Sequence, residues 1–180
     1  MTTPPALADA PTSDGNPGLI VAAAVDRCLE IAGSWLRWDG RPVHRGENVW
    51  TPHKSLRRIT DHLLDHLAEV EALLAGVPTI PDRWHGRAVT LDADWARFTE
   101  PDLDEARSRL TRLGQLYLLR YSAAGPTAWD AARGDAWTLR TIAEHVAEVV
   151  WYAEQMGTSA QQISGADDRF TPGAPRPQRV

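Results

Sequence analysis

Apolar residues recur at intervals of three and four in four separate stretches of the chain, which is the spacing of one face of an α-helix. A threonine opens each of the last three stretches, and its hydroxyl oxygen suits the first position of a helix (Thr51, Thr99 and Thr138). Pro52 follows the first of these threonines, where a helix tolerates proline best. The pattern therefore predicts an all-α protein with helices over residues 18–36, 51–76, 99–124 and 138–157.

The segment between the second and third predicted helices, residues 77–98, has no sustained period and contains two prolines and a glycine. We interpret it as a loop with one short strand at residues 87–91. Four amphipathic helices with one long crossover between the second and the third are typical of a four-helix bundle. The sequence predicts one such domain over residues 18–160, flanked by disordered tails at 1–17 and 161–180 that hold too few apolar residues to offset their ordering entropy.

Charge and composition exclude several classes of function. The net charge is -5 and the arginines are scattered, so no basic stripe is available for nucleic acid. The longest apolar run, residues 19–25, is too short to cross a membrane, and no export signal precedes it. The single cysteine, Cys28, has no partner for an intramolecular disulfide and fits a reducing compartment. We expect a cytoplasmic protein.

Two near-repeats, Asp65–Glu71 and Glu144–Val150, each carry a histidine behind an acid in a helical pattern. His62 and His66 stand four residues apart, so they lie one above the other on the same side of the second helix. If the second and fourth helices pack side by side, His145 meets them across the groove. The pattern predicts that His62, His66 and His145 hold a divalent metal. The competing interpretation is that this spacing arises by chance and the imidazoles are merely hydrogen-bonded or solvated.

Other polar groups have weaker claims to a site. His53, near the start of the second helix, is the reserve ligand, whereas His44 and His85 are expected at the surface. The acids beside the histidines fall mostly on polar helix faces. The exception is Glu148, three residues after His145, which is placed either to ligate a metal or to orient the imidazole.

Residues 55–63 in the second helix and 137–148 in the fourth resemble motifs of the DinB/YfiT superfamily, and the resemblance covers about residues 18–157. This superfamily consists of bacterial four-helix bundles and includes mycothiol-dependent maleylpyruvate isomerases. The resemblance implies a site for zinc or nickel made by one histidine of the second helix and an HxxxH pair in the last helix. His62 and His145 match two of these ligands, but the third position is occupied by Val149, which cannot coordinate.

This departure leaves two functions open. In one, His66 replaces the missing ligand, and the protein is a metal-dependent transferase, isomerase or hydrolase, with or without dependence on a thiol, that acts on a small molecule or a low-molecular-weight thiol. In the other, the bundle binds a small molecule or a protein partner without metal and without catalysis. A homodimer formed through helix faces is compatible with both. The sequence identifies no catalytic residue and no substrate.

Overall fold

The computed structural model describes residues 15–158, which are mostly helical with one small two-stranded sheet. The α-helices are α1 (Gly18–Gly33), α2 (Pro52–Ala75), α3 (Glu100–Ala124), α4 (Pro126–Trp129), α5 (Leu139–Ala147) and α6 (Val150–Met156). The strands are β1 (Val43–Arg45) and β2 (Asn48–Trp50), and short 3-10 helices occupy Ser34–Arg37, His85–Arg87 and Asp92–Trp95. The tails that we expected lie almost entirely outside the described residues.

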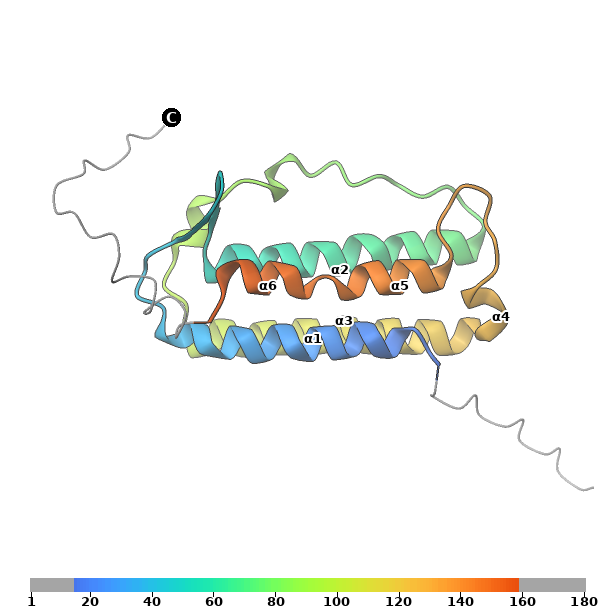
Figure 1. Ribbon diagram of the computed structural model, residues 1–180, viewed down its shortest axis with the longest axis horizontal. Helices are drawn as coiled ribbons and strands as arrows, with labels where there is room; N and C mark the ends of the chain where they lie inside the picture. Colours follow the sequence, from blue (N-terminus) through green and yellow to red (C-terminus); the bar gives the residue numbers. More distant parts are fainter. Residues whose placement is uncertain (1–14, 159–180) are drawn as a thin grey trace, which may run out of the picture.

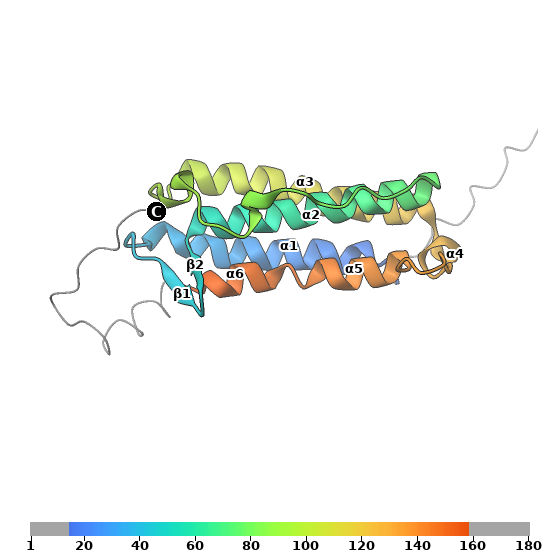
Figure 2. The same cartoon turned by 90° about the horizontal axis from the view of Figure 1, so that it is seen from above.

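The long helices lie side by side along one axis (Figures 1 and 2). α1 packs against α3 and against the α5–α6 pair, and α2 likewise packs against α3 and against α5–α6. α2 and α3 run in one direction, whereas α1 and α5–α6 run in the other (Figure 1). Since α2 and α3 are parallel, residues 77–98 must carry the chain back along the length of α2 before α3 begins. The long crossover is therefore a consequence of helix direction.

Capping at the helix ends confirms the predicted boundaries of α2 and α3. The Thr51 hydroxyl accepts a hydrogen bond from the Lys54 backbone N–H, and Gly76 ends α2 in a left-handed conformation with φ of 67°. At the start of α3, the Asp102 carboxylate accepts hydrogen bonds from the Thr99 backbone N–H and hydroxyl, at 2.8 and 2.5 Å. Both arrangements satisfy backbone donors that a helix start leaves without partners.

The core is made by the apolar faces of α1, α2, α3 and the α5–α6 pair. Two tyrosines of α3 cross it and donate their hydroxyl hydrogens to backbone carbonyls, Tyr117 to Leu63 at 2.7 Å and Tyr121 to Leu139 at 2.6 Å. These bonds tie α3 to α2 and to the start of α5. The fully buried side chains include Val21, Val25, Cys28, Trp35, Ile59, Leu63, Leu103, Leu110, Ile142 and Val149.

Four local predictions need correction. The strand expected at 87–91 is wrong, because that stretch contains the end of a 3-10 turn and a bend. The hairpin β1–β2, which pairs Val43 with Trp50, was missed. The fourth helix is not continuous but breaks into α5 and α6. Asn16, placed in the tail, is instead buried, and its amide donates a hydrogen bond to the Ser122 hydroxyl at 2.8 Å.

Candidate metal centre

The three histidines predicted from the repeat meet between α2 and α5. His62 and His66 project from successive turns of α2, and His145 projects from α5. The ring centroids form a nearly equilateral triangle, with 4.7 Å between His62 and His66, 5.0 Å between His62 and His145, and 4.9 Å between His66 and His145. The structure thus brings all three predicted ligands together.

One ring nitrogen from each histidine lies within 4.8 Å of the others. A point shared by three atoms at that spacing is at most about 2.8 Å from each, which is 4.8 Å divided by the square root of three. Zinc requires nitrogen at roughly 2.0 to 2.1 Å. Each nitrogen would therefore have to move by less than about 1 Å to reach a common ion.

His62 is partly buried within the cluster. Burial, and then the neighbouring His66 and His145, together lower its pKa from 6.5 to about 4. The imidazole is consequently neutral near pH 7, and it has a nitrogen lone pair that can accept a hydrogen bond or coordinate a metal.

A carboxylate three residues further along the helix holds each of the other two rings. His66 Nδ1 lies 2.7 Å from Glu69 Oε2, and His145 Nδ1 lies 3.2 Å from Glu148 Oε2. A carboxylate bonded to one ring nitrogen fixes the ring orientation and leaves the other nitrogen, Nε2, as the coordinating atom. Of the two roles considered for Glu148, the structure shows the orienting one.

Glu69 was missed in the sequence, where it was grouped with solvated acids. The signal was present, because both near-repeats contain a histidine followed three residues later by glutamate, His66 with Glu69 and His145 with Glu148. That spacing places the two side chains on adjacent turns of one helix.

Aromatic and cationic side chains border the cluster. The Tyr152 ring stands edge-on to His62 with 5.6 Å between centroids, and Trp137 stands edge-on to His145 at 5.1 Å. Arg58 donates from Nη2 to the Tyr152 hydroxyl at 3.0 Å and from Nη1 to Asp61 Oδ2 at 3.1 Å. A positive charge and a phenolic hydroxyl therefore lie next to the histidines.

Val149 lies in the core, at the point where the last helix breaks. The backbone N–H groups of Glu148 and Val149 bond to carbonyls three residues back, His145 and Val146, each at 3.0 Å, instead of four residues back as in an α-helix. This tightening separates α5 from α6, and Val149 is fully buried. The position at which the resemblance implies a third ligand thus contributes packing.

His53 and His44 do not join the cluster, and the His85 side chain lies outside the described part of the structure. His53 packs its ring against Phe98 at 5.4 Å between centroids, and its Nε2 lies 3.5 Å from the Arg97 carbonyl oxygen. His44 pairs with Val49 in the hairpin and is exposed. Within residues 15–158, the group of histidines, cysteines and acids close enough to hold a metal consists of His62, His66 and His145.

Comparisons with known proteins identify no relative of this chain. No protein-family model, curated protein or solved structure matches the chain. Among the described helices, none combines the length and the hydropathy needed to cross a lipid bilayer.

Proposed function

We propose that the protein is a DinB-like four-helix bundle that binds one divalent metal ion, zinc or nickel, through His62, His66 and His145. The observation that carries the proposal is the convergence of one nitrogen from each ring within 4.8 Å. Imidazole nitrogen suits both ions. In this site His66 supplies the third ligand that Val149 does not.

The arrangement of donors fits a reactive metal better than a purely structural one. Three protein ligands leave a fourth position of a tetrahedral ion open, whereas structural zinc sites are closed by four protein ligands. A divalent ion held this way supplies a Lewis acid and lowers the pKa of a water or thiol bound to it. The Glu69 and Glu148 carboxylates keep two ligand rings oriented, as supporting partners do in known metal sites.

The chemistry of the rim indicates the kind of molecule that would occupy the open position. An open position on a divalent ion favours a small anionic ligand, and the Tyr152 hydroxyl, which accepts a hydrogen bond from Arg58, lies beside His62 where it could donate to such a ligand. A low-molecular-weight thiol, which binds metal as thiolate, or a small carboxylate meets that requirement. An enzyme built on this site would be a metal-dependent transferase, isomerase or hydrolase.

Metal analysis tests the proposal directly. Full-length protein purified without a histidine tag should bind one equivalent of Zn²⁺ or Ni²⁺ by titration calorimetry and retain it through gel filtration. His62→Ala and His145→Ala should lower the stoichiometry to near zero, whereas His53→Ala, outside the cluster, should leave it at one. Equal metal binding in the wild type and in both cluster variants, or no binding in the wild type, overturns the proposal.

A metal-free binding protein is the second candidate, and Val149 is the observation that favours it. Its burial shows that the position between α5 and α6, which the resemblance implies as a ligand, is part of the core. Under this alternative, neither chelator nor added Zn²⁺ changes the melting temperature, whereas a ligand that binds only the native state raises it. A clear rise with Zn²⁺ that is lost in His145→Ala excludes the alternative.

A further inference from the structure

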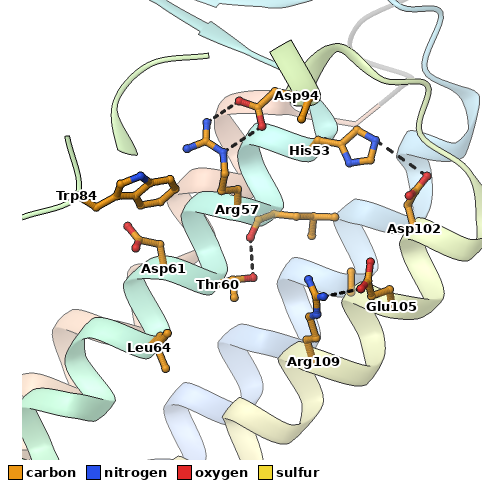
Figure 3. A pocket seen from close by; sticks show the side chains of 13 residues that line it. His53, Arg57, Thr60, Asp61, Leu64, Trp84, Asp94, Asp102, Glu105 and Arg109 are labelled. Atoms are coloured by element: carbon orange, nitrogen blue, oxygen red, sulfur yellow. Dashed lines mark hydrogen bonds and ion pairs between the residues drawn. The ribbon is translucent and has the colours of Figure 1, made fainter. Parts of the chain in front are cut away.

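A second candidate site lies on the opposite side of α2 from the residues that face α5. A cavity of about 440 Å³ opens between α2, α3 and the crossover segment (Figure 3). Its volume falls within the range of small-molecule pockets, roughly 300 to 1,000 Å³. None of His62, His66 and His145 lines it, so the cavity is independent of the proposed metal centre.

The walls of the cavity include an apolar surface large enough for an organic group. Leu56 and Ala106 are nearly buried and come from the two facing helices. Leu64 and Trp84 lie at the rim, where 58% and 39% of their surfaces are exposed. Partly exposed apolar side chains around a concave site are typical of a surface that a ligand covers.

The charged groups of the cavity are mostly acidic. Two guanidinium groups line it, against four carboxylates (Asp61, Asp94, Asp102 and Glu105). Both guanidinium groups are already paired. Arg57 donates to both oxygens of Asp94, at 3.0 and 2.5 Å, and to the backbone carbonyls of Gly86 and Val89, while Arg109 pairs with Glu105 at 2.5 Å. An anionic ligand would meet an excess of negative charge and no uncommitted cation.

Asp61 has capacity to accept a further donor. Its Oδ2 accepts a hydrogen bond from Arg58 at 3.1 Å, and within the described residues no hydrogen bond to its Oδ1 is present. Its side chain is 22% exposed, and its carboxylate points toward the Trp84 indole (Figure 3). The Arg57 guanidinium already lies 5.1 Å from the centroid of the Trp84 ring, so the ring contributes an apolar surface. The Asp61 carboxylate offers an organic ammonium a charge-assisted hydrogen bond.

We propose that this cavity binds a small organic cation, a primary ammonium on an apolar body, with Asp61 accepting the ammonium hydrogens and Trp84 and Leu56 contacting the apolar part. The crossover segment forms the outer wall, since Trp84 belongs to it and Arg57 fastens it to α2 through Gly86, Val89 and Asp94. The long connection between two parallel helices thus becomes part of a binding site.

Three probes of the same size and different charge test the proposal on the full chain. Phenethylammonium should bind with a saturable change in ligand-observed NMR at low millimolar concentration. The neutral 2-phenylethanol and the anionic phenylacetate should bind at least tenfold more weakly. Absence of saturable binding by phenethylammonium, or equal binding by phenylacetate, overturns the proposal.

Variants then locate the binding. Asp61→Asn should weaken phenethylammonium binding about tenfold or more, because it removes a charged acceptor. Asp104→Asn is the matched control, since Asp104 is exposed on α3 and does not line the cavity. Trp84→Leu, a change in the crossover away from the helices, should weaken binding severalfold and decides the question if Asp61→Asn does not fold. Unchanged binding in the folded variants, or equal loss in Asp104→Asn, overturns the proposal.

Discussion

Acid should destabilise the folded protein over a pH range that His62 defines. Its pKa is about 4 in the folded chain and 6.5 when unperturbed, because burial and the other two imidazoles disfavour the charged form. Between pH 6.5 and pH 4, His62 is therefore protonated in the unfolded chain but neutral in the folded chain. The stability contributed by the neutral ring is fully present above pH 6.5 and is lost as the pH falls toward 4.

The magnitude follows from the difference between the two pKa values of His62, 6.5 and about 4. At 1.36 kcal/mol for each pH unit, the full effect is about 3 kcal/mol, of which roughly two thirds is lost between pH 7 and pH 4.5. That is a substantial part of the 5 to 15 kcal/mol that stabilises an ordinary domain. The lowered pKa values of Asp102 and Asp130 act in more acidic solution, because those carboxyl groups titrate from 3.8 downward.

Urea unfolding followed by circular dichroism at pH 7, 6, 5 and 4.5, with chelator present, measures this loss. In His62→Gln the side chain stays neutral throughout, so the free energy of unfolding should fall by about 2 kcal/mol less than in the wild type over the same range. His53→Gln, which changes a histidine outside the cluster, should follow the wild-type curve. Parallel curves for the wild type and His62→Gln would refute the reasoning.

Two further predictions concern helix packing and the support of the metal ligands. Gly18→Ala should destabilise the fold by about 1 to 3 kcal/mol, because a Cβ there would come within 2.7 Å of the Leu118 backbone. Gly33→Ala, where the added atom meets nothing within 4 Å, should be neutral or stabilising, and equal thermal shifts for the two variants would contradict this packing argument. Glu69→Gln and Glu148→Gln should each weaken Zn²⁺ binding about 10- to 100-fold in a chelator competition assay, because each carboxylate orients a ligand ring. Glu144→Gln, an exposed acid beside His145, should have little effect, and a loss of the same size in all three variants would show that only net charge matters.

The helices were predictable because their signals are local and repeated. Between six and seven turns of apolar residues, a capping threonine and a terminal glycine are all readable within about 27 residues, and the bounds of α2 and α3 agree with them closely. The hairpin β1–β2 has only three residues in each strand, which is too short for an alternating pattern to stand out. The break between α5 and α6 has no local signal either, since Glu148 and Val149 are neither glycine nor proline.

The site was predictable as far as it lies on single helices. The spacing of His62 and His66 predicts two ligands on one side of a single helix, and the near-repeat indicates His145 as the third, on a neighbouring helix. The contact between Arg58 and Tyr152 joins residues 94 positions apart, so it depends on how α2 and α6 pack. The cavity depends on the path of residues 77–98, for which the sequence offers no periodic pattern.

Arg58 gives the two sides of α2 a physical connection. One end of its guanidinium holds Tyr152 beside His62, and the other holds Asp61 at the cavity. A cation that competes for Asp61 would shift the balance of these two hydrogen bonds, and so would an anion bound near Tyr152. Such an effect is reciprocal: each ligand would change the affinity of the other by the same factor. If both proposed sites bind their ligands, Arg58 is the residue through which the two ligands would affect each other.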